Sequence, residues 1–455
     1  MIVAKVRYLA AVAGFTVAMV AATLPARAET LADALTSAYK TSHLIDQNRA
    51  VLRAADEDVA SAVARLRPVL QWVAQSSIYD IPSGSGLSAS LALQGQVTIL
   101  DFGRGKIGID IAKESVMATR EALIGIEQQV LFSAVRAYFS VSSATENVAL
   151  NRNSVRVLDE TLRATKDQFD VGEVTRTDVA QAEARVASAR AGLASAEGQL
   201  AAAREEYRAA TGHYPGVLAP APRAPALPGS MAEATAIANR SHPAIRQAQH
   251  QALAADFGIA LAAAQRMPEL NGNLQLKSDS QTGGSSAIGF ELSQTIFSGG
   301  AMSAAHRKAI AQRDAARSAL HQATVIVTQG VGTSWSEIEV ARAQISATDR
   351  QIEAARIAYD GVREEAKLGA RTTLDVLNAE QDLLNAQADR ISTDAGLQVA
   401  FYSLLASMGL LTVEHLNLGL PVYDPSAYYN AVENAPVTSV QGKSLDRVLK
   451  AIGRN

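Results

Sequence analysis

The strongest constraint on this chain is an internal duplication. The segment 171–179 (VGEVTRTDV) is matched by 368–376 (LGARTTLDV), 197 positions later. Each copy is followed by an alanine-rich stretch, which ends at Gly212 in the first copy and at Gly409 in the second. A repeat of this length is too long for a solenoid unit. We therefore expect two halves with the same architecture.

The N-terminal residues 1–28 have the organisation of a secretory signal peptide. Two cations precede an apolar run over 9–24, and the small-residue cleavage site at 26–28 comes just before Glu29. The run is short for a transmembrane anchor, which is the alternative interpretation. Removal of the segment changes the formal net charge from −3 to about −6, which argues against nucleic acid as a partner.

The absence of cysteine limits how the exported chain can be held in the cell envelope. There is no disulfide and no lipid-attachment cysteine after the signal peptide. No later segment provides the roughly 20 apolar residues of a transmembrane helix. If the protein enters a membrane, it must therefore do so as a closed β-barrel.

Two pairs of alternating segments supply candidate strands for such a barrel. Apolar and polar side chains alternate at about 69–80, 87–100, 269–279 and 286–297. Each segment has about the length that a tilted membrane strand needs, and the loops between paired segments are polar. A half-exposed soluble sheet has the same alternation, so this pattern alone leaves both interpretations open.

Long proline-free segments predict helices of unusual length. Each half contains one such segment, at 103–171 and at 300–368, and each predicts a helix about 100 Å long. Heptad-like apolar seams run along them and along the helices expected at 175–211 and 372–408. An ordinary amphipathic bundle does not explain helices this long combined with strand pairs this short.

The remaining segments complete the expected organisation. The first repeat is expected over 29–211 and the second over 231–409, and each begins with short helices before its strands. A proline-rich linker, 212–230, separates them. We expect the tail, 410–455, to be packed loosely or partly disordered.

Strand counting predicts an oligomer. Two strands per half give four per chain, which cannot close a barrel. Eight strands from two chains give a lumen that side chains fill, whereas twelve strands from three chains leave an open bore. We therefore expect a homotrimer with its helices continuing the bore.

No pattern typical of an enzyme is present. The seven histidines are scattered and none has metal-ligand spacing, so we assign no catalytic, cofactor-binding or metal residues. The Gly-Arg-Gly at 103–105 lacks the rest of a phosphate-binding loop and fits a strand-to-helix bend.

At this point the motifs resemble those of a known family. They are the duplication, Ser241-His242-Pro243, the segment QTIFSGG at 294–300, its counterpart LDFG at 100–103, and the two Gly-x-x-Thr-x-x-Asp-Val turns. Over essentially all of the mature sequence the chain resembles the TolC-like outer membrane factors of Gram-negative bacteria.

The resemblance implies an α+β membrane channel. Each chain would contribute four β-strands to a shared 12-stranded trimeric β-barrel and long coiled-coil helices to a trimeric periplasmic α-barrel. Such a channel lies in the outer membrane, in contact with its lipid, and docks a periplasmic adaptor (membrane fusion protein) and an inner-membrane pump. It is a passive exit duct of a tripartite efflux pump or a type I secretion system, needs no cofactor, and carries drugs, metal ions or proteins.

The resemblance also implies a gate near the helix turns. Arg371 would bond to Thr177 and Asp178, and Asp375 would form a ring at the narrowest point. Asn378 stands where the best-known pattern has a second aspartate, which implies a weaker lock. The helix dipole by itself also favours acids at such early helical positions, so a purely structural role stays open for Asp178 and Asp375.

The turns themselves correspond to the adaptor-docking tips of the family. Their glycines also fit a role as helix C-caps, and the two roles are compatible. The docking residues implied are Gly172, Glu173, Val174, Gly369 and Ala370.

Two other classes of protein share part of this pattern. A periplasmic adaptor has a coiled-coil hairpin, but one hairpin rather than two repeats with membrane-length strands. A structural coiled-coil scaffold of the cell envelope needs no alternating strands. Both remain alternatives to the channel on the sequence alone.

Overall fold

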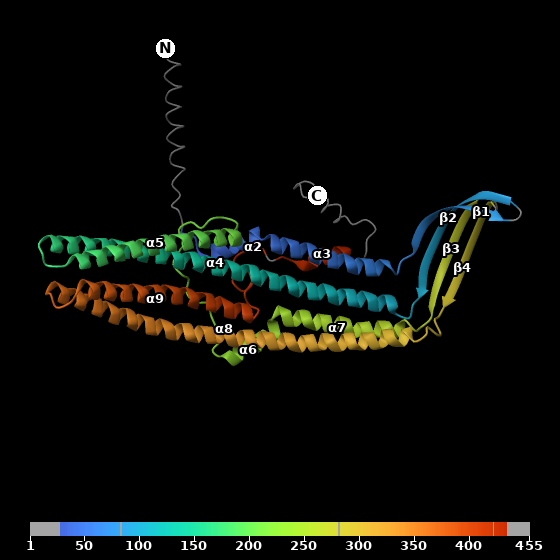
Figure 1. Cartoon of the computed structure of the whole chain (residues 1–455). Helices are drawn as coiled ribbons and strands as arrows, with labels where there is room; N and C mark the ends of the chain where they lie inside the picture. Colours follow the sequence, from blue (N-terminus) through green and yellow to red (C-terminus); the bar gives the residue numbers. More distant parts are fainter. Residues whose placement is uncertain (1–27, 82–83, 281–282, 422, 435–455) are drawn as a thin grey trace, which may run out of the picture. The chain divides into compact units, whose positions relative to one another are not determined.

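The computed structural model describes residues 28–81, 84–280, 283–421 and 423–434. The predicted signal peptide, 1–28, lies outside the described residues except for residue 28, and so does the end of the tail, 435–455. The elements are shown in Figure 1. In chain order they are α2 (Leu31–Thr41), α3 (His43–Ala64), β1 (Val69–Ile81), β2 (Gly84–Leu100), α4 (Arg104–Asp170), α5 (Arg176–Thr211), α6 (Met231–Ser241), α7 (Pro243–Ala264), β3 (Glu269–Asp279), β4 (Gly283–Ser293), α8 (Ala301–Lys367), α9 (Thr373–Ser407) and α10 (Pro425–Val432).

The two repeats have the same order of elements. Each has two short helices, two strands, a helix of 67 residues, and then a helix of 36 or 35 residues. At about 1.5 Å per residue, α4 and α8 are each about 100 Å long. They continue uninterrupted because no proline occurs in them, and each ends at a turn with a glycine at positive φ. The predicted fold class of long helices with two strand pairs is confirmed.

The chain forms two compact units, and each unit takes segments from both repeats. Among the described residues, unit 1 contains 28–42, Val130–Leu227 and Ser334–Ser403. Unit 2 contains His43–Gln129, Pro228–Thr333 and residues from Leu404 onward. The helix tips therefore belong to unit 1 and the strands to unit 2.

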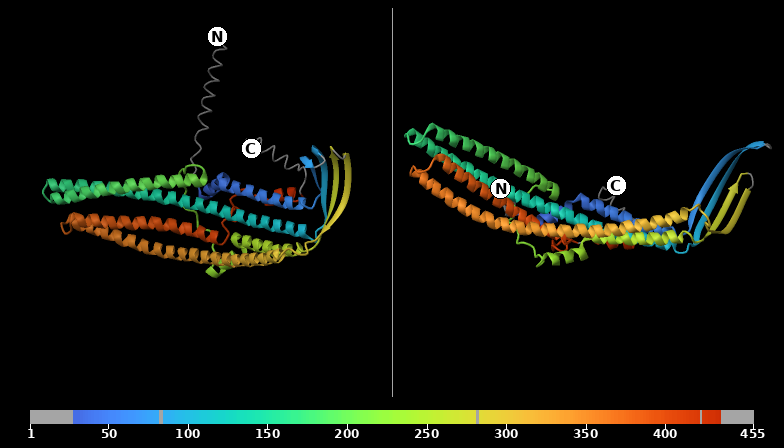
Figure 2. Two further views of the ribbon diagram at one scale, coloured as in Figure 1. Left: turned by 45° about the vertical axis from the view of Figure 1, so that its right-hand side comes forward. Right: turned by 60° about the horizontal axis from the view of Figure 1, so that its bottom comes forward.

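The four strands form one antiparallel sheet in the order β1-β2-β3-β4, and Figure 2 shows them side by side. The register places Trp72 opposite Leu93, and Leu93 opposite Leu276, so the large apolar residues share one face. Trp72 is 69% exposed and Phe290 is 74% exposed, so this face lies open in the single chain. Two strands from each repeat thus build a surface that needs an apolar environment.

The opposite face of the sheet is polar. The amide of Gln71 donates to Gln94 at 3.1 Å, the hydroxyl of Thr98 donates to the Asn271 side chain at 3.1 Å, and other short polar residues alternate with them. Within the described sheet, β1 and β4 each pair with one strand only, so both edges offer unpaired backbone groups.

The fourth strand begins and ends earlier than the predicted range, 286–297, because it spans Gly283–Ser293. We expected strand up to residue 297, but β4 ends at Ser293, whose partner is Glu269, the first residue of β3. Residues 294–297 have no partner strand, because Pro268 precedes β3 and cannot donate a ladder hydrogen bond. Ile296 is 90% exposed, although it continues the alternation.

In both repeats, a hydroxyl group at the end of the first short helix donates to a carbonyl at the end of the helix that follows the tip. In unit 1 the hydroxyl of Thr41, at the end of α2, donates to the carbonyl of Thr211 at 3.0 Å. In unit 2 the hydroxyl of Ser241, at the end of α6, donates to the carbonyl of Met408 at 3.2 Å. These bonds satisfy carbonyls that have no partner within their own helix ends.

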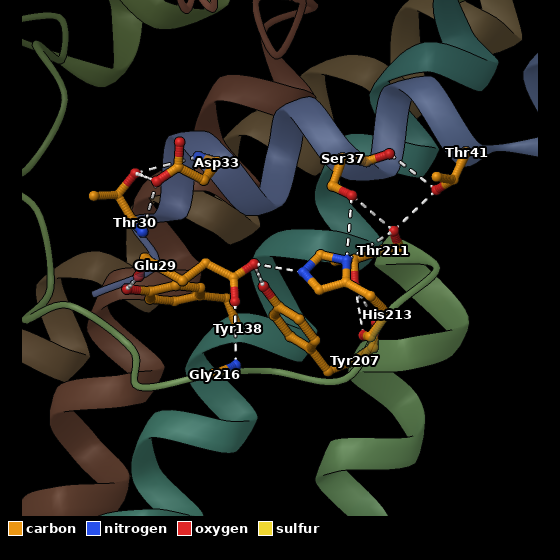
Figure 3. Close-up of polar contacts among 10 residues, drawn as sticks. All are labelled: Glu29, Thr30, Asp33, Ser37, Thr41, Tyr138, Tyr207, Thr211, His213 and Gly216. Carbon is orange, nitrogen blue, oxygen red and sulfur yellow. Dashed lines mark hydrogen bonds and ion pairs between the residues drawn. The ribbon is translucent and has the colours of Figure 1, made fainter. Parts of the chain in front are cut away.

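A polar network in unit 1 holds the first residue after the predicted cleavage site (Figure 3). The carboxylate of Glu29 accepts a hydrogen bond from the hydroxyl of Tyr207 at 2.5 Å and from the backbone N–H of Gly216 at 3.3 Å. His213 Nε2 lies 2.9 Å from the same carboxylate. Burial raises the pKa of Tyr207, and the bond to Glu29 raises it further, so this hydroxyl remains a donor.

The described part of the tail contacts unit 2, and the expectation of partial disorder in 410–455 stays a prediction. The hydroxyl of Tyr428 in α10 donates to Glu57 of α3 at 2.6 Å. The guanidinium carbons of Arg49 and Arg120 lie 4.9 Å and 5.0 Å from the ring centroids of Tyr423 and Tyr429. One cation–π contact and one hydrogen bond therefore hold α10 in unit 2, and a second cation–π contact holds the segment just before it.

Candidate functional site at the helix tips

The first tip connects α4 to α5. Gly172 has φ +82°, and its N–H donates to the carbonyl of Phe169 at 3.0 Å. The N–H of Glu173 donates to the carbonyl of Gln168 at 2.9 Å. Such bonds close the last turn of a helix and require a residue that tolerates the left-handed conformation. Gly172 is therefore a C-cap, as the sequence indicated.

The second tip repeats this geometry between α8 and α9. Gly369 has φ +78° and donates to Ala366 at 3.0 Å, and the N–H of Ala370 donates to Glu365 at 3.0 Å. Leu368 and its counterpart Val171 are 86% and 73% exposed. Each tip thus presents an apolar side chain to its surroundings at the same position of the repeat.

Both aspartates of the turn motif cap the following helix. The N–H and the hydroxyl of Thr175 donate to Asp178 at 2.9 Å and 2.7 Å. The same groups of Thr372 donate to Asp375 at 3.0 Å and 2.8 Å. These bonds hold the pKa of Asp178 and of Asp375 below the usual range of a carboxyl group, so both carboxylates stay ionised near neutral pH.

In the single chain, the guanidinium group of Arg371 forms an ion pair within its own tip. Its Nε donates to the Glu365 carboxylate at 2.9 Å, and both side chains are about half exposed. Of the described residues, Thr177 and Asp178 are not hydrogen-bonded to Arg371. The exposed ion pair contributes little to stability, so Arg371 is available for a stronger partner.

Asn378 links the two repeats. Its side-chain oxygen accepts a hydrogen bond of 2.7 Å from Arg185 of α5, a residue that lies 193 positions earlier in the chain. One residue before it, Leu377 is 1% exposed and packs against Leu158 of α4 and Val186 of α5. The start of α9 is therefore attached to the first-repeat helices by an apolar contact and a charge-assisted hydrogen bond.

Glu380 is a buried acid beside this link. Glu380 is 8% exposed, and its Oε2 has no hydrogen-bond partner among the described residues. Burial raises the pKa of Glu380 to about 7, although the charges of Arg185 and Arg363 act in the opposite direction. Burial disfavours the ionised form, and these two cations offset only part of that effect.

The sequence left Arg185 and Glu380 out of the candidate site. Glu380 was visible only as the repeat partner of Glu183, and Arg185 only as an ordinary polar helical residue. Glu380 lies next to the heptad seam of α9, where charged residues are common, so no local pattern indicated that it would be buried.

Two further findings concern the described part of the chain. No group of three or more histidine or acidic residues there has the arrangement of a metal site. No helix among these residues combines the length and apolar character that crossing a membrane requires.

Comparison with known proteins identifies the family. The model of the family described as outer membrane efflux protein matches residues 34–213 and 236–410. The chain is 34% identical over 422 residues to the outer membrane efflux protein BepC of Brucella suis biovar 1 (strain 1330), which covers 90% of this chain and 91% of that protein. It is 26% identical over 306 residues to the alkaline protease secretion protein AprF of Pseudomonas aeruginosa, which covers 64% of this chain and 63% of that protein.

The fold is similar to solved channel structures. The crystal structure of the outer membrane protein VceC from Vibrio cholerae aligns with a TM-score of 0.73 at 20% identity, over 83% of this chain and 96% of that chain. The chain belongs to the outer membrane efflux protein family. It is therefore an outer membrane channel protein with a large periplasmic helical portion, and it is a conduit and not an enzyme.

Proposed function

We propose that three copies of this chain form one channel that serves as the exit duct of an efflux pump or a type I secretion system. The faces and the open edges of the β-sheet support this proposal. Its four strands have one apolar and one polar face and two open edges, β1 and β4. Joining β4 of one chain to β1 of the next satisfies both edges, and three chains give twelve strands with a polar bore.

The exposed tips support a role in docking a periplasmic adaptor. Gly172, Glu173, Val174, Gly369 and Ala370 form the two turns, and each turn is preceded by an exposed apolar residue. Exposed apolar side chains at equivalent positions favour a partner that contacts both tips in the same way. The adaptor would connect the duct to an inner-membrane pump that supplies the energy.

The gate is proposed at the start of α9. Asp375 is ionised, Arg371 pairs with the exposed Glu365 in its own tip, and Thr177 and Asp178 are exposed or half-buried in the neighbouring tip. In a trimer, Arg371 can exchange Glu365 for Asp178, and a partly shielded pair of this kind contributes about 1.5–3 kcal/mol.

Planar-bilayer recording tests the proposed channel and its gate. Arg371→Ser is expected to raise single-channel conductance, because the closed mouth loses its charge-assisted bonds. Glu365→Gln is the matched control, since it breaks only the pair within one tip and should leave conductance unchanged. Absence of ion-conducting steps in both proteins and in the unaltered chain would refute the channel.

The acid at the narrowest point predicts a second property. Three copies of Asp375 would form an acidic ring, which favours cations in a pore. Multivalent cations are expected to block from the periplasmic side. Asp375→Ala should remove most of this block, and Asn378→Asp should strengthen it by adding a second ring. Equal block in Asp375→Ala would place the constriction elsewhere.

A further inference from the structure

The duplication exposes one acid whose surroundings differ sharply between the repeats. Glu183 in α5 and Glu380 in α9 occupy equivalent positions, and so do Lys166 in α4 and Arg363 in α8. In the first repeat, Lys166 Nζ lies 2.7 Å from the Glu183 carboxylate, and both side chains are about half exposed. In the second repeat, Glu380 is 8% exposed and one of its oxygens has no hydrogen-bond partner among the described residues.

The difference follows from the attachment of α9 to the first repeat. Leu377 lies in the apolar cluster with α4 and α5, and this contact carries Glu380 inward. Arg185 of α5, whose charge acts on Glu380, donates to Asn378. A protonated carboxyl group fits this position without a partner charge, whereas an ionised one does not.

The charged and titratable groups that act on Glu380 come from two elements. They are Arg185 of α5, and Arg363 and Tyr359 of α8. The α4 residues of the adjoining cluster, Leu158 and Leu162, are apolar. The acid therefore has cations nearby but no direct bond to its free oxygen, and its proton can be lost near neutral pH.

We propose that Glu380 is a proton-controlled positioning residue that keeps the start of α9 packed against α5 while its carboxyl group is protonated. Loss of the proton to solvent leaves a buried carboxylate that needs donors. It obtains them by drawing the Arg185 guanidinium away from Asn378 or by moving α9 until water reaches it. Both responses weaken the Arg185–Asn378 link, so the tip loosens as pH rises.

The movement can be measured without any channel activity. The chain has no native cysteine, so spin labels can be placed at Ser188→Cys in α5 and Asn385→Cys in α9, both of which are exposed. The distance distribution between the labels is expected to be narrow at about pH 5.5 and broader at about pH 8.5, on either side of the Glu380 transition. Glu380→Gln should stay narrow at both values.

Two variants make this test specific. Glu183→Gln, at the equivalent position of the first repeat, should behave like the unaltered protein. Arg185→Gln removes the donor to Asn378 and should give a broad distribution already at the lower pH. A distribution that does not change with pH in the unaltered protein, or that changes equally in Glu380→Gln, would overturn the proposal.

The inference rests on the proposed channel only for its effect on gating. If the channel is correct, conductance should rise with pH in the unaltered protein and in Glu183→Gln but not in Glu380→Gln. Channel activity without a change of label distance refutes the Glu380 mechanism and leaves the channel intact. A pH-dependent distance change in a protein that conducts no ions refutes the channel and leaves the mechanism intact.

Discussion

The two helix tips have the same local bonds but different surroundings. The hydroxyl of Thr175 donates to Asp178 at 2.7 Å, and that of Thr372 donates to Asp375 at 2.8 Å. A few residues further along each helix the repeats differ. Glu380 is buried, whereas its counterpart Glu183 is exposed. The duplication has preserved what a turn needs locally, while positions that face other helices have diverged.

The opposite end of the paired helices shows the same contrast. Tyr207 near the end of α5 is fully buried and donates to Glu29. Its repeat counterpart, Leu404 in α9, is also fully buried but apolar. In the first repeat the Glu29 carboxylate lies at this place and accepts the Tyr207 hydrogen bond. The second repeat continues from the linker and has an apolar core there.

The largest expected effect comes from breaking the network that only the first repeat has. Glu29→Ala removes an acceptor that three donor groups contact. Leaving the buried Tyr207 hydroxyl without a partner should lower the free energy of unfolding by about 3 kcal/mol. Thermal unfolding in detergent, followed by circular dichroism, measures this.

A control in the second repeat sharpens that prediction. Glu233→Ala removes one exposed bond, from the N–H of Gly229 at 2.9 Å, and should cost no more than a few tenths of a kcal/mol. Tyr207→Phe tests the network without altering the residue next to the predicted cleavage site. Equal losses in Glu29→Ala and Glu233→Ala would show that the network contributes nothing special.

The next largest effect is a dependence of stability on pH, which is expected for Glu380 but not for Glu183. The pKa of Glu380 is raised from 4.5 to about 7, so its favourable contribution is complete below pH 4.5 and is lost as pH rises through 7. Glu380→Gln should therefore be more stable than the unaltered chain above pH 7, by about 3 kcal/mol at most. The difference should disappear at acidic pH, and a pH-independent difference would contradict this account.

The capping threonines should give effects of similar size in both repeats. Thr175→Ala and Thr372→Ala each remove the hydroxyl of a capping box, which costs about 1 kcal/mol. Hydrogen exchange in the first turns of α5 and α9 should increase by a similar factor. A much larger effect at Thr372 would show that the second tip depends on contacts beyond its own cap.

The smallest effect is expected at the exposed pair of the first repeat. Lys166 and Glu183 are about half exposed, and such ion pairs contribute about 0–1 kcal/mol. Glu183→Gln should change the unfolding midpoint by less than any variant above, and added salt should reduce the change further. A loss comparable to that of Glu29→Ala would mean that Glu183 has a buried role.

Sequence patterns predicted what depends on neighbouring residues. The Gly-x-x-Thr-x-x-Asp motif contains both a C-cap and a capping box, so the tips and the placement of Asp178 and Asp375 at the start of a helix followed from the letters alone. Alternation in the same way predicted the strands and their two faces. These features need no knowledge of distant partners.

The failures involve contacts between distant segments. Arg185 and Asn378 are separated by 193 positions, and no local pattern joins them. The end of β4 depends on where β3 begins, and the packing of α10 depends on Glu57 and Arg120 in other elements. The burial of Glu380 likewise follows from the packing of Leu377 between helices of the first repeat.

The central claim is that four strands per chain require three chains to close. The mass of the purified complex in detergent, measured by light scattering with the detergent contribution subtracted, tests it most directly. The account predicts a single species of three chains that dissociates when heated in denaturing detergent. A stable monomer or dimer as the only species would contradict it.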